Sequence, residues 1–266
     1  MYSFILERTT DMLKTMIKVV KEASQIMLDA QNITDNTIKK GDRNFVTLYD
    51  TKVQKFIQNT MNKIYPEISF LGEEDASDSD PYNGYCFICD PIDGTANFKR
   101  SYKHSAISLA LAKDGEIICG VVINPYSKEI FYASKGKGAF LNDTKICVSD
   151  ACLKDSFVSF GTAPYYPDLI NKTMQMITKI MPDCEDIRRT GSAALDLCYL
   201  ACGRHDMFFE LSLFPWDYAA ASIIIEEAGG IITDRNGNKP PLHKRTEIYA
   251  GNKKVYKEFF DKNYFI

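Results

Sequence analysis

The sequence Asp90-Pro91-Ile92-Asp93-Gly94-Thr95 directly follows the apolar run of residues 84–89. This run has the length and composition of a buried β-strand, which we expect to end at Asp90, where Pro91 stiffens the exit and Gly94 permits a tight turn. Two carboxylates three residues apart at a strand's end can converge on one point, and a helical turn opening at Thr95 would present free N–H groups to an anion. An Asp-Pro pair alone indicates an ordinary turn, but the whole hexapeptide after a buried strand indicates a functional site.

Outward from this segment, the first half of the chain predicts two helices packed on a largely antiparallel sheet. Apolar residues recur at helical spacing over residues 4–30 and 47–64, and a polar loop is expected at 39–44 between them. Short apolar segments separated by turn signals predict strands. These segments are residues 68–71, 84–89, 106–112, 117–123, 130–133 and 139–141.

After about residue 150 the pattern changes to alternating strands and helices, which is typical of an α/β layer. The expected strands are residues 156–160, 185–189, 206–210, 231–233 and 247–250, and the expected helices are 167–180, 192–202, 216–228 and 252–260. We therefore predict an N-terminal α+β half over residues 1–150 and a C-terminal α/β half over residues 151–266. The two halves should pack as one unit, with a cleft where they meet.

Composition excludes several classes of protein. The chain has 266 residues, of which 45% are hydrophobic and 25% charged, as in ordinary globular domains. Lysine and arginine number 32 against 35 aspartate and glutamate, and this net charge of −3 argues against a nucleic-acid partner. With only three histidines, a histidine-rich zinc site is not expected. A metal here would be held by carboxylates, which favour a hard cation such as Mg²⁺.

Membrane and disulfide classes are also disfavoured. No apolar run reaches the roughly 18 to 20 residues of a membrane span, and charged residues interrupt the apolar pattern at the N-terminus, so we expect a cytoplasmic protein with neither signal peptide nor membrane partner. Cys86 and Cys89 lie three apart on one predicted strand, where they point to opposite faces and cannot chelate one ion. Buried, reduced thiols are expected at all eight cysteines: 86, 89, 119, 147, 152, 184, 198 and 202.

Further acidic residues stand at the ends of predicted elements. The sequence Gly72-Glu73-Glu74-Asp75 follows the strand at 68–71, and Asp217 opens the apolar helix at 216–228. Alone, the first is more simply a solvated acidic loop, and the second a residue that complements a helix dipole. If these acids converge with Asp90 and Asp93 at one cleft, they form a site where divalent cations could recruit phosphate and activate water.

The combination resembles the inositol monophosphatase family of magnesium-dependent, lithium-sensitive phosphatases. The resemblance rests on the segments from Asp90 to Phe98 and from Trp216 to Ala221, with Gly72-Glu73-Glu74 at a family-like distance before the first, and it extends from Lys39 to Gly230. With the element pattern, it predicts a layered αβαβα sandwich of mixed α+β and α/β class. It also implies a homodimer with about two to three Mg²⁺ ions per subunit.

The resemblance assigns roles to individual residues. It implies that the metal ligands are Glu73, Asp90, Asp93, Asp217 and the carbonyl of Ile92, with Asp50 near a weaker third ion. Glu73 and Thr95 would orient and deprotonate the attacking water, and Asp93 would be indispensable for turnover. The substrate contacts implied are Gly94, Thr95, Gly191, Ser192, Ala193, Glu210 and Asp217. Lys39 resembles the basic residue of a mobile loop that closes over the site.

The leading expectation is hydrolysis of a small polyol or sugar phosphate, with inositol 1-phosphate first, by direct attack of metal-activated water. Fructose-1,6-bisphosphatase is the main alternative. A 3′-phosphoadenosine phosphate nucleotidase is less favoured, because that branch usually carries a Lys-Glu pair where this chain has Ala96-Asn97. A histidinol-phosphate phosphatase also remains open, as does a regulatory binding protein that uses the fold without turnover.

Overall fold

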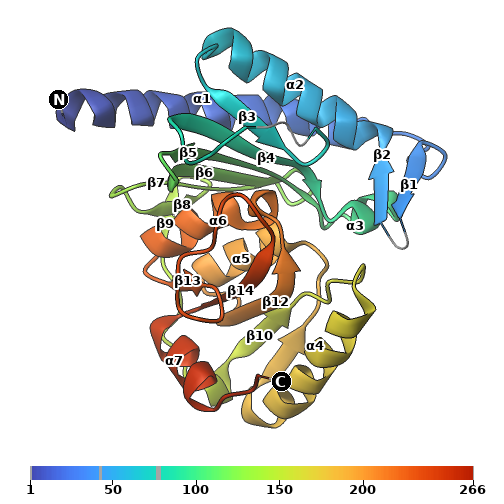
Figure 1. Cartoon of the computed structure of the whole chain (residues 1–266), viewed down its shortest axis with the longest axis vertical. Helices are drawn as coiled ribbons and strands as arrows, with labels where there is room; N and C mark the ends of the chain where they lie inside the picture. The colour runs from blue at the N-terminus through green and yellow to red at the C-terminus, as the bar shows by residue number, and fades with distance from the viewer. Residues whose placement is uncertain (1, 42–43, 76–78, 266) are drawn as a thin grey trace.

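Five layers stack in the order helices, sheet, helices, sheet, helices (Figure 1). The structure is a computed structural model that describes residues 2–41, 44–75 and 79–265, without the side chains of residues 2–8, 39–41 and 44–45. Helices α1 (Tyr2–Leu28) and α2 (Leu48–Ile64) cover the outer face of a seven-stranded sheet. Helices α5 (Ala193–Ala201) and α6 (Pro215–Glu227) fill the middle layer. Helices α4 (Pro167–Ile180) and α7 (Lys253–Asp261) cover the far side of a five-stranded sheet, which confirms the predicted αβαβα sandwich.

The first sheet is largely antiparallel, as predicted, with one parallel pair, β3 and β4. Its spatial order follows the chain order. The strands are β3 (Ser69–Gly72), β4 (Tyr85–Asp93), β5 (Ala106–Lys113), β6 (Glu116–Asn124), β7 (Glu129–Ser134), β8 (Ala139–Leu141) and β9 (Thr144–Ile146). Strand β9, at one edge, was not predicted, because Thr144-Lys145-Ile146 has too little apolar character to signal a strand by itself.

The prediction that the strand ends at Asp90 is wrong, because β4 continues to Asp93. Its pairing with β3 stops at Cys89, while its pairing with β5 shifts register between Asp90 and Asp93. A bulge of this kind re-aims side chains, and Pro91 is tolerated there because no β3 residue is paired opposite it. The irregular end of β4 therefore delivers both aspartates from a strand rather than from a loop.

The second sheet is mixed and has the order β11-β10-β12-β14-β13. Its strands are β10 (Phe157–Phe160), β11 (Asp186–Arg188), β12 (Met207–Leu213), β13 (Ile231–Thr233) and β14 (Thr246–Gly251). Strands β10, β11 and β12 run parallel, so their carboxyl ends meet at one edge of the sheet. Loops at that edge are the usual ligand-binding position in such sheets. A short 3₁₀ turn, Leu153–Asp155, precedes β10, and a second, Met181–Asp183, follows α4.

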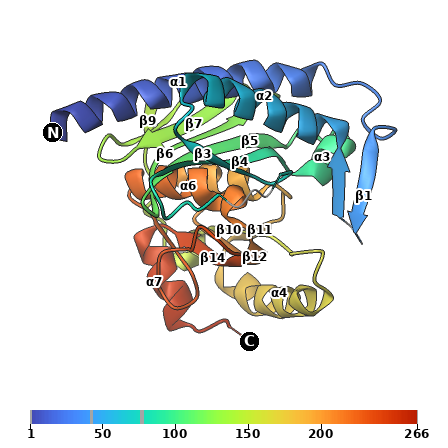
Figure 2. The same ribbon diagram turned by 45° about the horizontal axis from the view of Figure 1, so that its top comes forward.

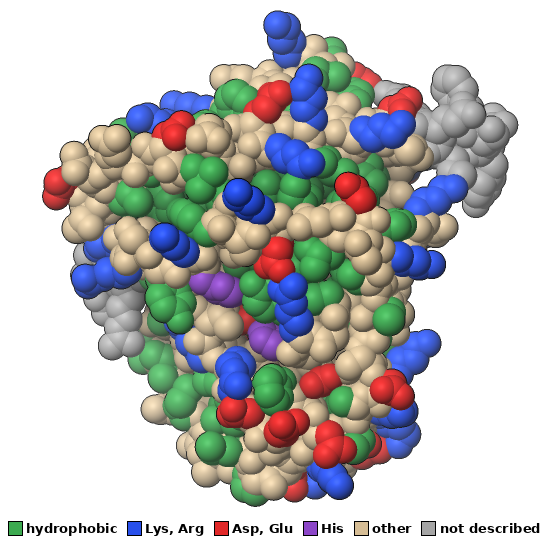
Figure 3. All heavy atoms as spheres, turned by 180° about the vertical axis from the view of Figure 1, so that it is seen from behind, with side chains coloured by type: hydrophobic (Ala, Val, Ile, Leu, Met, Phe, Trp, Pro, Cys, Tyr) green, Lys and Arg blue, Asp and Glu red, His purple; other side chains and the backbone are tan. Residues whose placement is uncertain are grey.

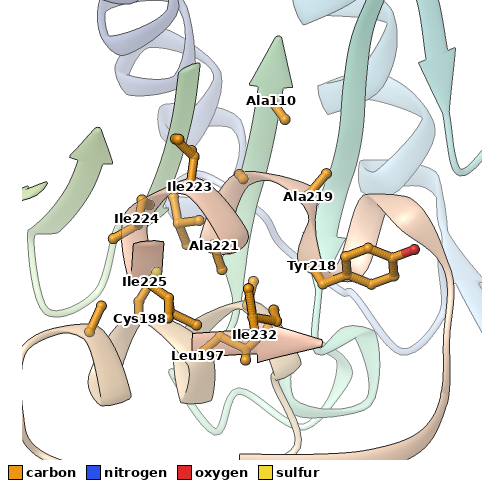
Figure 4. Packing of buried hydrophobic residues seen from close by; sticks show 14 of the residues in the cluster. Ala110, Leu197, Cys198, Tyr218, Ala219, Ala221, Ile223, Ile224, Ile225 and Ile232 are labelled. Atoms are coloured by element: carbon orange, nitrogen blue, oxygen red, sulfur yellow. The ribbon is translucent and has the colours of Figure 1, made fainter. Parts of the chain in front are cut away.

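Residues 218–225 of helix α6 are all buried between the two sheets. Figure 4 shows Ile223, Ile224 and Ile225 of this helix among Leu197 and Cys198 of α5 and neighbouring residues of both sheets. A helix that is apolar all round can only be stable in such a position. It approaches the first sheet tightly at Gly120 of β6, where an added Cβ would lie 2.3 Å from the carbonyl oxygen of Ala220.

We expect Gly120→Ala to lower the free energy of unfolding by about 1 to 3 kcal/mol, because overpacking forces α6 away from the sheet. Urea denaturation monitored by circular dichroism measures the loss. The same substitution in an Ile223→Ala background should cost nearly as much, because the clash with the Ala220 carbonyl remains when the Ile223 side chain is gone. Unchanged stability of Gly120→Ala would contradict the close packing described here.

The region expected to be a polar loop at 39–44 is instead part of a β-hairpin. Strands β1 (Thr37–Gly41) and β2 (Asn44–Thr47) pair antiparallel, with Ile38 opposite Val46. Residues 42–43 lie outside the described part of the chain. The polar composition misled the prediction, because hairpin strands are held by backbone pairing and can be polar. The hairpin and the short helix α3 (Thr95–Lys99) lie together at one end of the molecule (Figure 2).

The cysteines are all unpaired, as predicted, but not all are buried. Cys86, Cys89, Cys119 and Cys198 are buried, three others are partly covered, and Cys147 is exposed because it follows the edge strand β9. The expectation of eight buried thiols is therefore wrong for half of them.

The charged groups follow the near-neutral balance of the composition. Acidic and basic side chains are interspersed over the face seen in Figure 3, rather than gathered into one basic field. Within the described ranges, none of the helices combines the length and the apolar character that a bilayer crossing requires.

Candidate active site

A cavity of about 340 Å³ opens where the end of β4 faces the carboxyl edge of the second sheet. It is lined from both halves of the chain. The predicted site residues on its wall are Glu73, Asp90, Ile92, Asp93, Gly94, Thr95, Gly191, Ser192, Ala193, Glu210 and Asp217. Residues far apart in sequence are thus brought to one cavity, as the sequence motifs predicted. Asp50 and Lys39 are not among the lining residues.

Six carboxylates line this cavity, and four of them belong to the predicted metal site: Glu73 after β3, Asp90 and Asp93 on β4, and Asp217 in the first turn of α6. Burial raises the pKa of Asp90 well above its ordinary range, and repulsion from Glu73, Asp93 and Asp217 raises it further. Burial likewise raises the pKa of Asp217, with added repulsion from Glu73 and Asp93. The cluster is therefore costly to ionise unless a cation or protons compensate it.

Local hydrogen bonds orient these carboxylates. Asp93 Oδ2 accepts from the Ser192 hydroxyl and from the Ala194 N–H, the latter at 2.9 Å. Burial raises the pKa of Asp93 to about 6, although those hydrogen bonds oppose the rise. Asp90 Oδ1 accepts from the Ile92 N–H at 2.9 Å, and Asp217 Oδ2 from the Phe214 N–H at 2.7 Å. Asp217 therefore caps the N-terminus of α6, as the sequence allowed, and it also lies on the cavity wall.

The residue types fit a hard divalent cation, because carboxylate and carbonyl oxygens are the ligands that Mg²⁺ prefers. The mutual repulsion that raises the pKa of Asp90 and Asp217 supports the same conclusion, since a cation would relieve it. No three His, Cys, Asp or Glu side chains in residues 2–41, 44–75 and 79–265 already stand where they could hold one ion. The four carboxylates therefore line one cavity, but no three of them lie close enough together in the described chain to bind the same ion.

The turn after β4 has a backbone that only glycine suits. Gly94 has φ +83°, and a Cβ there would lie 3.1 Å from the carbonyl oxygens of Gly191 and His104. Thr95 begins α3, and its hydroxyl lies within donating distance of the Ile92 carbonyl at 3.1 Å and of Asp50 Oδ1 at 3.2 Å. The predicted helical turn after Gly94 is therefore present, and it leans against the Gly191 loop of the other half.

Two predicted residues lie outside the cavity wall. Asp50 is buried in the first turn of α2, where its Oδ2 accepts from the Thr47 backbone N–H at 2.8 Å in a capping box. Burial raises the pKa of Asp50 to about 6. Its Oδ1 lies 3.2 Å from the Thr95 hydroxyl, and its charge adds to the repulsion that raises the pKa of Asp90. A role beside a third ion remains a prediction. Lys39 lies in β1, opposite Phe45, and its side chain falls outside the described residues.

The second half supplies the opposite wall. Ser192 caps α5, and its hydroxyl bonds Asp93 as described above. Glu210 on β12 is buried and accepts from the Ala163 N–H at 2.9 Å. Burial raises the pKa of Glu210 to about 7. Gly161 makes room for it, because a Cβ there would lie 1.8 Å from Glu210 Oε2.

The sequence did not predict one contact that joins the two halves, which is made by Asn97. The Asn97 side-chain amide donates to the His104 carbonyl at 2.8 Å and to the Thr190 carbonyl at 3.0 Å. It thereby ties the α3 turn to the residue before Gly191. Asn97 lies within the quoted signature, but the spacing of residues in one segment carries no information about a carbonyl 93 positions away.

We expect Asn97→Asp to impair catalysis more than stability, because a carboxylate would face two carbonyl oxygens and push the Gly191 loop away. A rise of about 10-fold in KM is expected, as for loss of a hydrogen bond worth about 1 to 2 kcal/mol. Steady-state phosphate release with magnesium measures it. The change keeps the side-chain shape but replaces the donor by a charged acceptor. Asn142→Asp makes the same exchange at an exposed turn, where the amide donates to the Lys128 carbonyl, so it is the matched control and should leave KM unchanged.

Several residues of the cavity wall were also absent from the prediction, among them Phe160, Tyr165, Tyr166, Arg189, Asp196 and Ser212. Tyr165 and Tyr166 follow β10, and Arg189 follows β11, both at the carboxyl edge of the second sheet. That position was a usable signal, because ligands bind outside the carboxyl ends of parallel strands. The sequence does not show which of the predicted strands run parallel, so the shared edge of β10, β11 and β12 could not be predicted.

The model of the inositol monophosphatase family matches residues 4–263, nearly the whole chain. The chain belongs to the inositol monophosphatase family. Membership implies a metal-dependent phosphatase, which agrees with the carboxylate cavity. The family resemblance noted from the two signatures is thereby confirmed.

Individual relatives of this family match over most of their length. An inositol-1-monophosphatase of Rhizobium meliloti (strain 1021) is 36% identical over 247 residues, 92% of each chain. The Nus factor SuhB of Escherichia coli (strain K12) is 34% identical over 249 residues, 92% of this chain and 93% of the relative. The solved structure of a Thermotoga maritima IMPase superposes with a TM-score of 0.86 at 33% identity, covering 94% of this chain and 96% of that one. All three are similar to this chain over more than nine-tenths of its length, but the functions that their names state differ.

Proposed function

We propose that this protein hydrolyses small polyol or sugar phosphate monoesters with Mg²⁺, and that inositol 1-phosphate is the first substrate to test. The observation that carries the proposal is the single cavity shared by four carboxylates, the Gly94-Thr95 turn and Glu210. A phosphate dianion would be repelled by the carboxylates alone. The arrangement makes chemical sense only if cations lie between carboxylates and phosphate.

In this mechanism Glu73, Asp90, Asp93, Asp217 and the Ile92 carbonyl would hold the cations. When bound, a divalent cation would supply charge neutralisation for the phosphate and the leaving oxygen and would acidify water. The side chains and backbone of the protein then bind the substrate and orient the attacking water, and no covalent phosphoenzyme forms.

The remaining groups divide these tasks. Glu73 and the Thr95 hydroxyl orient the attacking water, and its proton passes to the Glu73 carboxylate or, through the Thr95 hydroxyl, to Asp50. The backbone N–H groups of Gly94 and Thr95 hold the phosphate. On the opposite wall, Glu210 binds a substrate hydroxyl, and the Gly191-Ser192-Ala193 loop positions the inositol or sugar ring of the substrate. With a pKa near 7, Glu210 can serve as acceptor or donor around neutral pH.

A phosphate-release panel with magnesium tests this proposal. Inositol 1-phosphate, fructose 1,6-bisphosphate, 3′-phosphoadenosine phosphate and histidinol phosphate are compared, each with and without lithium. The highest kcat/KM is expected for inositol 1-phosphate, with inhibition by lithium. A clear preference for another ester would replace the proposed substrate, and a trapped phosphoenzyme would overturn the direct attack of water.

The same proposal extends to assembly and location. We propose a cytoplasmic homodimer, on the strength of the family resemblance. Light scattering coupled to size exclusion should give about twice the 30.1 kDa of the chain. A monomer at micromolar concentration would contradict the proposed dimer and leave the proposed catalytic function untouched.

A second candidate function comes from the relatives named Nus factor SuhB. We propose it as the alternative, in which the chain acts as a regulatory binding protein. The intact set of four carboxylates favours catalysis over this reading. A purified sample that releases no phosphate from any ester with magnesium would favour binding.

A further inference from the structure

Gln54 is a buried polar side chain among apolar residues of α2. It is only 2% exposed, and Val53, Ile57 and Met61 of the same helix belong to the hydrophobic cluster that packs α2 against the first sheet. A buried amide costs free energy unless its polar atoms are hydrogen-bonded. The side-chain oxygen of Gln54 accepts from the backbone N–H of Glu74 at 2.9 Å, so the amide is turned toward the segment that follows β3.

The amide of Gln54 packs closely against the end of β3. A Cβ on Gly72, the last residue of that strand, would lie 2.4 Å from the amide carbon of Gln54 and 2.5 Å from its Oε1. The absence of a side chain at Gly72 therefore leaves the space that the amide occupies. A larger residue there would displace the amide from the Glu74 N–H.

Glu73 lies between two fixed points of the backbone. Its own N–H donates to the carbonyl of Cys89, one residue before Asp90, at 3.2 Å, and the N–H of the next residue, Glu74, donates to Gln54. The first hydrogen bond sets the position of Glu73 along β4, and the second sets the direction in which the chain leaves the sheet. The Glu73 side chain lies on the cavity wall, whereas Gln54 and Glu74 are not among the described residues that line it.

The same face of α2 supports both groups that are proposed to handle the attacking water. Asp50 lies four residues before Gln54, and residues four apart share a helix face. Asp50 Oδ1 lies 3.2 Å from the Thr95 hydroxyl, and Gln54 holds the segment that carries Glu73. Helix α2 thus contacts both Thr95 and the Glu73 segment from behind the cavity wall.

An amide suits this position better than a carboxylate. Three acidic residues, Asp50, Glu73 and Glu74, already lie next to Gln54 along the helix or along the segment that it contacts. Burial raises the pKa of Asp50, and repulsion from Glu74 adds to the rise. A glutamine accepts the Glu74 N–H without adding a further negative charge, so it orients the segment and leaves the net charge of the cation site unchanged.

We propose that Gln54 is a positioning residue for the cation site, which holds Glu73 in the direction in which its carboxylate binds the divalent cation. This inference rests on the proposed phosphatase function, and it assigns part of the affinity for Mg²⁺ to a residue outside the cavity wall. Gln54 touches neither the substrate nor the cation, so it acts only through Glu73.

The test measures Mg²⁺ binding by calorimetry and phosphate release from inositol 1-phosphate. Gln54→Met keeps the length of the side chain but offers no oxygen to the Glu74 N–H. Its Kd for Mg²⁺ should rise about 10-fold, the lower end of the range for residues that orient metal ligands, and half-maximal turnover should need about 10-fold more magnesium. At saturating magnesium the KM for substrate should change less than about 3-fold, because Gln54 lies outside the cavity wall.

Two variants separate positioning from charge and from stability. Gln54→Glu retains the acceptor oxygen, so its Kd for Mg²⁺ should not exceed that of the wild type. Met61→Ala truncates a buried apolar side chain about two turns further along α2, so it should lower the melting temperature and leave the Kd for Mg²⁺ unchanged. A Met61→Ala variant that loses as much Mg²⁺ affinity as Gln54→Met would overturn the inference, because the loss would then follow from stability alone.

Gly72→Ala perturbs the same contact from the strand. Its Cβ would take the place of the Gln54 amide, so Mg²⁺ binding should weaken about as much as in Gln54→Met. In Gly72→Ala/Gln54→Ala the added methyl group no longer meets the amide, so the loss should be no greater than for Gln54→Ala alone. Additive losses from the two substitutions would overturn the inference.

Binding and turnover together separate this inference from the proposed function. Equal Kd values for Mg²⁺ in the wild type and Gln54→Met, with phosphate release by both, would overturn the role of Gln54 and leave the phosphatase function standing. A weaker Kd in Gln54→Met, without phosphate release by any variant, would support the role of Gln54 and overturn the function. Absence of Mg²⁺ binding by the wild type would overturn both.

Discussion

Asp93→Asn is expected to abolish phosphate release while the protein remains folded. The substitution removes a charged oxygen ligand from the carboxylate cavity, and a loss of at least about 100-fold in kcat is expected, since even partners of metal ligands cost 10- to 100-fold. The amide oxygen can still accept the hydrogen bond from the Ala194 N–H, so the seam between the halves is retained. Without metal, the variant should be at least as stable as wild type, because one of several repelling charges is gone.

Asp196→Asn is the matched control for this variant. Asp196 is also a buried aspartate on the cavity wall with a pKa raised mainly by burial and further by repulsion from Asp93 and Glu210, but it accepts from the Thr190 hydroxyl at 2.8 Å and is not one of the predicted metal ligands. An asparagine oxygen can accept the same bond, so turnover should fall far less. Phosphate release at saturating magnesium and thermal melts measure both variants. Wild-type turnover by Asp93→Asn would refute its assignment as a metal ligand.

Removal of divalent cations should stop turnover and lower the melting temperature, most strongly above pH 6. A ligand at about 100 times its Kd adds about 2.7 kcal/mol to stability, or roughly 5 to 10 °C in a domain of this size. The pKa of Asp93 is about 6 in the folded protein against an ordinary 3.8. The metal-free folded state therefore holds this proton more tightly than the unfolded chain, and Asp93 disfavours folding progressively as the pH rises from about 4 to about 6.

Melting curves with EDTA and with magnesium, at pH 5 and pH 7.5, measure this coupling. The stabilisation by magnesium should be larger at pH 7.5, because protonated carboxylates do not bind the cation. In Asp93→Asn the difference between the two pH values should shrink. Equal stabilisation at both pH values would show that the cation binds away from the carboxylate cluster.

The long elements of the fold were predictable because each carries its own periodic signal. Helices α1, α2, α4 and α7 and strands β5 and β6 are amphipathic or strongly apolar, so local sequence is enough to find them. The hairpin β1–β2 and strand β9 depend on pairing between polar segments, which a pattern of burial does not contain. The extension of β4 to Asp93 was missed for a similar reason, since Pro91 is permitted there only because β3 has already ended.

For the site, the carboxylates were found because each stands at the end of an element. Asn97 and Arg189 were missed because their importance comes from what lies opposite them in space. Asn97 reaches a carbonyl of the other half, and Arg189 lies over a glycine next to the phosphate turn. Only the pairing of β10, β11 and β12 shows that Tyr165 and Arg189 share one edge with Glu210.

The wedging of α6 between two sheets has a consequence for how substrate range can change in this family. Asp217 sits on that helix, and Gly120 leaves the helix no space to shift, so the cation-holding end of the cavity tolerates little variation. Thr162, Tyr165 and Arg189 belong to loops outside the hydrophobic core clusters, whereas Gly161 and Ala163 must be kept because they accommodate Glu210. Exchange of these loops between relatives should therefore transfer substrate preference while the phosphate chemistry is inherited unchanged, which makes the rim the part of the molecule to engineer.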